Sequence, residues 1–165
     1  MAAQELVVES EAKERSARAV VGRGAVCSVA SSLVVSVCLV AVVMLDGYTH
    51  LYSLVLIGVA AGGAMATQVP VGSRAGGLVS LLTTALFVAL TIPAVATAST
   101  VQAEGLDREG APAEITRAFE EVGGLAGSYL WMMDTGGMMV AAYAAAALVL
   151  GLACALLLGR RDQAS

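Results

Sequence analysis

Charged side chains are scarce in this chain. Only 13% of its 165 residues are Asp, Glu, Lys or Arg, whereas a soluble globular domain usually carries about 25%. The few charges are clustered, so long stretches contain none, and 58% of the residues are hydrophobic. This composition excludes an ordinary soluble domain and is typical of an integral membrane protein.

Side chains that commonly perform catalysis or bind metals are also few. The single histidine, His50, excludes haem ligation by two histidines of one chain. The three cysteines lie in apolar runs without a Cys-x-x-Cys pair, which argues against a zinc site and against thiol–disulfide exchange. A Gly-x-Ser-x-Gly nucleophile motif is missing as well. We therefore expect no enzyme activity, no metal and no cofactor.

Basic residues are few and form no block. The net charge is −4, and nothing in the sequence suits a nucleic-acid partner. Lys13 is the only lysine beside eight arginines. This preference is consistent with GC-rich codons, and we take it as an indication of a prokaryotic source.

Four apolar runs are long enough to cross a bilayer as helices, which takes about 20 residues. The connections after the first and second runs are short, with turn signals at Asp46-Gly47 and near Gly72, so neighbouring helices should be antiparallel. The sequence thus predicts an all-α, polytopic membrane protein: a four-transmembrane-helix bundle over residues 24–159. Its spans are 24–45, 51–71, 75–96 and 135–158.

The basic residues predict the orientation, because cytoplasmic segments carry an excess of Lys and Arg. Seven of the nine fall on one side of a four-span chain, in the tail 1–23, the second turn and the tail 160–165. The other side carries eight acidic residues: Asp46, Glu104, Asp107, Glu109, Glu114, Glu120, Glu121 and Asp134. We expect both termini to be cytoplasmic and the protein to lie in the plasma (cell) membrane.

Two segments outside the spans are predicted to be helical. In the tail 1–23, three i,i+4 pairs (Glu9–Lys13, Glu11–Arg15 and Glu14–Arg18) favour a helix that is either a docking surface or a solvated extension of the first span. The exterior loop, 97–127, contains an apolar face with Ile115, Phe119 and Val122 at i, i+4 and i+7. It predicts a short amphipathic helix on the membrane surface or over the end of the bundle.

Small residues recur every fourth position in the spans, a spacing that lets helix backbones approach closely in a bilayer. Serines mark a similar stripe on the first span. The three main stripes are Gly58, Gly62 and Ala66; Gly76, Ser80 and Thr84; and Gly137, Ala141 and Ala145. They predict close packing within the chain or, alternatively, contacts in a homo-oligomer or with another membrane protein.

Pro93 lies near the exterior end of the third predicted span. It removes one backbone hydrogen bond and should bend the third helix. We expect nearby Ser and Thr hydroxyls to bond the carbonyl that is left free.

Asp134 is the carboxylate closest to a span. The 24 residues after it rise about 36 Å as a helix, enough to cross without burying the charge. Tyr129 and Trp131 just before it are typical of the headgroup level. We interpret Asp134 as an interfacial cap of the fourth helix. The alternative is a proton or cation site in a water-filled vestibule.

These features favour a non-catalytic interaction or accessory protein whose partners are the lipid bilayer and a second copy or another membrane protein. The alternative function is a small-solute or ion transporter that uses Asp134 and the acidic exterior face.

Overall fold

The computed structural model describes residues 2–46, 48, 50–104 and 111–159. Within these ranges it describes side chains from Glu14 onward, except those of residues 104, 111, 112 and 114. Every regular element in these ranges is a helix. In chain order they are α1 (Ala2–Asp46), the 3₁₀ turn η1 (Leu51–Ser53), α2 (Leu54–Ala66), α3 (Arg74–Glu104), α4 (Ala111–Glu121), α5 (Gly124–Gly136) and α6 (Met138–Leu157).

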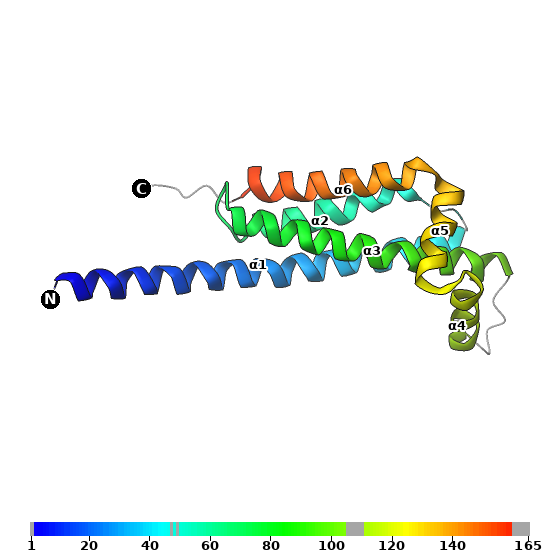
Figure 1. Ribbon diagram of the computed structural model, residues 1–165, viewed down its shortest axis with the longest axis horizontal. Coiled ribbons are helices and arrows are strands. Elements are labelled where there is room, and N and C mark those ends of the chain that lie inside the picture. The colour runs from blue at the N-terminus through cyan, green and yellow to red at the C-terminus, as the bar shows by residue number, and fades with distance from the viewer. Residues whose placement is uncertain (1, 47, 49, 105–110, 160–165) are drawn as a thin grey trace.

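Four of these helices, α1, α2, α3 and α6, lie side by side with their axes roughly aligned and form a bundle (Figure 1). Helices α4 and α5 lie across one end of it, and we call them the α4–α5 cap. At the opposite end α1 and α3 begin and α2 and α6 end. There the turn after α2 contacts the end of α6, since the Gly72 N–H donates to the Leu156 carbonyl over 2.9 Å.

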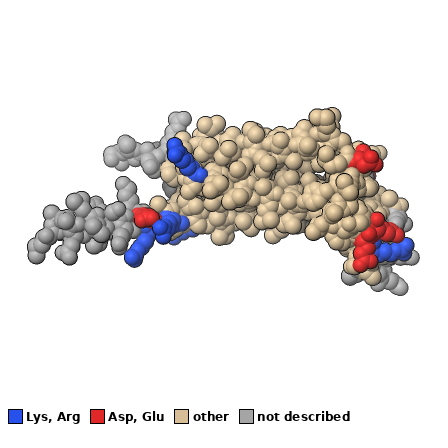
Figure 2. All heavy atoms as spheres, viewed as in Figure 1, with Lys and Arg blue, Asp and Glu red and all other residues tan. Residues whose placement is uncertain are grey.

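Three helices are long and apolar enough to cross a membrane: Glu14–Asp46, Arg74–Ala103 and Met138–Leu157. The chain is therefore helical with the features of an integral membrane protein. Figure 2 shows the described charged residues at the two ends of the molecule and an uncharged band between them on the face in view. This distribution is the one that a bilayer requires, because charges in its hydrocarbon centre are costly.

The second apolar segment is shorter than the predicted span of 51–71. Its helical part covers Leu51–Ala66, and residues 67–73 form the turn that contains Pro70. Proline lacks an N–H and restricts the residue before it, so the helix ends upstream.

The predicted exterior loop, 97–127, is largely helical instead. Helix α3 continues to Glu104, and hydroxyls in this part bond carbonyls of the same helix. Thr97 Oγ1 donates to the Pro93 carbonyl (2.9 Å) and Thr100 Oγ1 to the Ala96 carbonyl (3.1 Å). The amphipathic helix expected near Ile115 forms as α4. Its placement outside the cell stays a prediction.

The predicted fourth helix is interrupted at Gly137, so that α5 ends at Gly136 and α6 begins at Met138. Gly137 has φ 54° and ψ −143°, a backbone conformation that glycine adopts far more readily than other residues. The chain turns here, and α5 leaves the direction of the bundle (Figure 1).

The amino-terminal tail is part of α1, which extends past the ends of the other bundle helices (Figure 1). Of the three predicted ion pairs, Glu14–Arg18 is present at 2.6 Å between exposed side chains. The pairs Glu9–Lys13 and Glu11–Arg15 include side chains outside the described residues.

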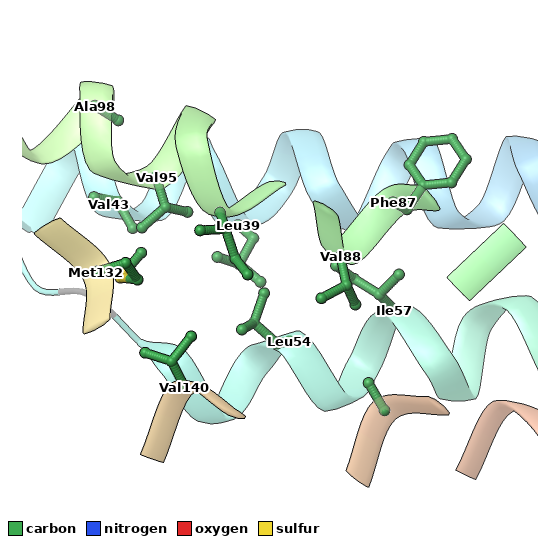
Figure 3. Packing of buried hydrophobic residues seen from close by; sticks show 12 residues of the cluster. Leu39, Val43, Leu54, Ile57, Phe87, Val88, Val95, Ala98, Met132 and Val140 are labelled. Carbon is green, nitrogen blue, oxygen red and sulfur yellow. The ribbon is translucent and has the colours of Figure 1, made fainter. Parts of the chain in front are cut away.

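The larger hydrophobic core lies between the bundle helices on the side of the cap (Figure 3). Val43, Leu54 and Ile57 are almost fully buried in it. Met132 of α5 also points into this core and is 1% exposed. The cap is therefore held by apolar burial, which contributes about 1.5–3 kcal/mol for a side chain of this size.

Candidate functional site

The α2–α6 interface is a close helix contact, and it contains two of the predicted glycines. A Cβ on Gly58 would overlap the Ala147 carbonyl of α6. A Cβ on Gly62 would overlap the Gly151 carbonyl and come within 2.7 Å of the Cys154 Cβ. The obstructing atoms at both positions include backbone, so the two helices can approach this closely only because these side chains are absent.

Helix α3 joins this interface through the Ser80 hydroxyl, and Thr84 of the same helix lies against Gly151. Ser80 Oγ donates to the Gly151 carbonyl (2.9 Å), and Thr84 Oγ1 donates to the Ser80 carbonyl (2.8 Å). Both side chains are fully buried. The structure therefore brings together Gly58, Gly62, Ser80 and Thr84, around Gly151, where α2, α3 and α6 meet.

The remaining stripe residues take different places. Ala66 is buried at the end of α2, and Gly76 is buried against Val69 of the preceding turn. Ala141 and Ala145 are exposed and Gly137 is half-buried at the corner, so this stripe is not the packing face of α6 within the chain. That face instead carries Ala147, Gly151 and Ala155.

Serines of α1 attach it to the bundle. Ser28 Oγ donates to the Ala61 carbonyl of α2 (3.0 Å), and Ser31 Oγ to the Ala60 carbonyl (3.1 Å). Farther along, Thr91 Oγ1 of α3 donates to Ser36 Oγ (2.9 Å). These polar groups connect neighbouring helices, as expected for hydroxyls buried in a membrane protein.

Asp134 lies in the last turn of α5 and is exposed. It does not cap the fourth span, which corrects the sequence-based interpretation: the N-cap of α6 is Gly137, and no side chain bonds the cap. The carboxylate stands at the end of a helix dipole that favours cations rather than anions. Its position is outside the candidate span Met138–Leu157.

Pro93 leaves the Ala89 carbonyl without its usual partner in α3, and Tyr129 supplies one. The Tyr129 hydroxyl of α5 donates to that carbonyl over 2.5 Å. The prediction that Ser or Thr would do so is wrong, since the neighbouring Thr97 bonds the Pro93 carbonyl instead. Tyr129 therefore replaces the hydrogen bond that Pro93 removes from α3, and it links the cap to the middle of that helix.

We expect Tyr129→Phe to lower the free energy of unfolding by about 1–3 kcal/mol, the cost of leaving a desolvated polar group unpaired. In a Pro93→Ala background residue 93 regains an N–H for the Ala89 carbonyl, so the same change should cost much less. Chemical unfolding in detergent micelles measures both. Tyr48→Phe is the control, because Tyr48 is 73% exposed. An equal cost of Tyr129→Phe with and without Pro93 would contradict this account.

A polar cluster that the sequence analysis missed lies in the turn after α1. His50 Nε2 bonds Asp46 Oδ2 over 2.5 Å, and the Tyr52 hydroxyl lies 3.1 Å from His50 Nδ1. A carboxylate only accepts, so Nε2 carries the hydrogen of the bond to Asp46. The i,i+4 spacing of Asp46 and His50 in the sequence could have indicated this contact.

Hydrogen bonds lower the pKa of Asp46, first from His50 and then from the Tyr48 backbone N–H. The uncharged stretch of α1 ends one residue earlier, so this carboxyl is outside it. Folding lowers this pKa, so the contacts stabilise the turn when the pH is above 3.8, the ordinary pKa of the group. This stabilisation is lost as the pH falls through the lowered pKa of the folded protein.

His50→Ala should therefore raise the pKa of Asp46 toward its ordinary value. A carboxyl ¹³C titration by NMR in micelles measures it. Tyr52→Phe is the matched control, because Tyr52 contacts the histidine and has no described bond to the carboxylate. An unchanged Asp46 titration in His50→Ala would show that the backbone N–H alone is responsible.

Among the described residues, no group of three or more His, Cys, Asp or Glu side chains could hold a metal ion. No model of a known protein family matches the chain, and neither a curated protein nor a solved structure matches it. The functional argument therefore rests on the geometry alone.

Proposed function

We propose that the chain is a four-span protein of a prokaryotic cell membrane with both termini in the cytoplasm. Helix α2 with η1 extends about 24 Å at the usual helical rise and lies along the other bundle helices, which supports a fourth crossing. Arg15, Arg18, Arg23 and Arg74 lie near the end where α1 leaves the bundle, and the positive-inside rule assigns such an end to the cytoplasm.

A fusion of a cytoplasm-specific fluorescent reporter tests this topology. Both an amino-terminal and a carboxyl-terminal fusion should be bright. A reporter placed after Gly124 within the cap should be dark. A dark carboxyl-terminal fusion beside a bright amino-terminal one would mean an odd number of spans, and would leave α2 as a helix that does not cross.

The function we propose is non-catalytic: binding of another protein at the membrane. One observation carries the proposal, the extension of α1 past the rest of the bundle (Figure 1). Residues 14–19 of this extension are all exposed. The described hydroxyls of the bundle, by contrast, mainly bond carbonyls of the chain itself. A rigid helix with exposed side chains is a common form of docking surface.

Photo-crosslinking in cells tests the proposal. A photoreactive amino acid at Ala17, which is exposed on α1, should give one dominant crosslinked protein. The charge reversal Arg18→Glu should reduce the yield, whereas Arg74→Glu, an exposed arginine near the same end, should not. The absence of a crosslinked protein at Ala17 would contradict the proposal.

Asp134→Asn separates this function from the transporter alternative. An interaction protein should keep its crosslink at Ala17, because the exposed carboxylate has no described partner. Loss of a proton-linked uptake or export activity in Asp134→Asn, with the crosslink unchanged, would favour the transporter.

A further inference from the structure

Two adjoining apolar cavities open on the surface between α1 and α3, each of about 390 Å³. Val40, Leu90 and Ala94 line both, so the cavities lie next to each other along the two helices. We call this feature the α1–α3 groove. It runs along α3 from Phe87 to Val101, about 21 Å at the helical rise.

The polar side chains of the groove already have partners. Thr97 bonds the Pro93 carbonyl, and Ser36 and Thr91 bond one another. All other lining residues are apolar. A polar ligand placed here would lose hydrogen bonds to water without replacing them, so the groove favours a hydrocarbon.

The α4–α5 cap covers one end of the groove with apolar side chains. Ile115 and Phe119 of α4 and Leu125 of α5 line it there. Arg117, Glu120 and Glu121 of α4 are exposed. The cap thus presents its apolar side to the groove and its charges to the solvent, the arrangement expected beside the headgroups of one leaflet.

The groove is about 21 Å long, and one leaflet of hydrocarbon is about 15 Å deep. The acyl chain of a lipid in that leaflet can therefore lie along the groove for its full depth in the hydrocarbon.

The groove is continuous with the lipid-facing surface of α3. Leu78, Leu82, Leu86 and Leu90 recur every fourth residue and are 54–61% exposed. Leu90, the last of this row, also lines both cavities. A lipid chain lying along the leucines therefore meets the groove without crossing a polar barrier.

We propose that the α1–α3 groove binds one acyl chain of a membrane glycerolipid from the leaflet next to the α4–α5 cap. The apolar side of the cap covers the end of that chain, and the headgroup lies at the level of the charged side of α4. This lipid site is independent of the protein-binding function proposed for the α1 extension.

A photoreactive phospholipid tests the site. The full chain is reconstituted in phosphatidylcholine vesicles containing a trace of phosphatidylcholine with a diazirine within one acyl chain, and labelled peptides are identified by mass spectrometry. We expect labelling to concentrate in residues 87–101. Ala94→Phe should reduce it about fivefold or more, the effect of about 1 kcal/mol. Ala85→Phe is the matched control, because Ala85 is an exposed alanine of α3 outside the groove.

Ala41→Phe places a ring in the groove from the α1 side and should reduce the labelling as Ala94→Phe does. If one of the two variants does not fold, the other still tests the proposal. Equal labelling of the leucine row and the groove would overturn the proposal, as would unchanged labelling in both variants. A disulfide-linked dimer of Ala94→Cys, in a background without the three native cysteines, would identify a second copy as the occupant and also overturn it.

Discussion

Gly58→Leu should be the most damaging single substitution in the bundle. The new side chain would have to occupy the space of the Ala147 carbonyl, so α2 and α6 must separate along the whole interface. Overpacking usually costs about 1–3 kcal/mol. Because the neighbouring contacts around Gly62 and Gly151 would also be lost, the cost for this variant should be at or above the upper end of that range. Even Gly58→Ala should be destabilising, because the first added carbon already overlaps the backbone.

Gly63→Leu is the matched control on the same helix. A Cβ at Gly63 meets nothing within 4 Å, so the same substitution should be neutral or slightly stabilising through better helix propensity. Unfolding of the three proteins in one detergent, followed by circular dichroism against denaturant, measures the difference. Equal stability of Gly58→Leu and Gly63→Leu would show that α2 does not pack on α6 through this face.

Gly137→Val should have the second largest effect. The residue is held at φ 54° and ψ −143°, and a β-branched side chain in such a conformation costs about 1–3 kcal/mol or more. Nothing lies within 4 Å of a Cβ at this position, so any loss of stability in the variant comes from backbone strain and not from steric overlap. Relief of the strain would straighten the corner and draw α5 away from the core that holds Met132.

Gly22→Val provides the comparison, because Gly22 is an exposed helical residue of α1 whose Cβ would also meet nothing. Unfolding of both variants in micelles should show a loss at Gly137 only. A second measurement is the cost of Tyr129→Phe in the Gly137→Val background, which should fall if α5 no longer reaches the Ala89 carbonyl. Full stability of Gly137→Val with an unchanged cost of Tyr129→Phe would contradict the prediction, because the corner would then tolerate a β-branched residue without strain.

Sequence reasoning located the long helices because hydropathy over 20 residues is a strong signal. The i,i+4 spacing of small residues also drew attention to Gly58, Gly62, Ser80 and Thr84, which lie around Gly151 in the structure. On α6 the residues that face α2 include Ala147 and Gly151, which are outside the stripe chosen from the sequence. Alanine and glycine are so frequent there that several faces satisfy the spacing, and only the partner helix selects the one with Gly151.

The cap could not be predicted in the same way. Its helices depend on contacts distant in sequence, such as Met132 in the core and Tyr129 on α3. The sequence did contain a local sign of the corner, the pair Gly136-Gly137, which was interpreted as part of a packing stripe. Two adjacent glycines between apolar segments indicate a helix break, because glycine has a low helix propensity.

The Tyr129 contact also has a consequence for biosynthesis. The Ala89 carbonyl and the hydroxyl that bonds it are 40 residues apart in the chain. When α3 first enters the bilayer, its proline defect has no partner, and it acquires one only after α5 has been synthesised. The third helix is thus completed by a later segment, and a chain that stops after α4 leaves an unpaired carbonyl at membrane depth. Quality-control proteases that sample unstable membrane helices should therefore remove such truncated chains faster when Pro93 is present than when it is replaced by alanine.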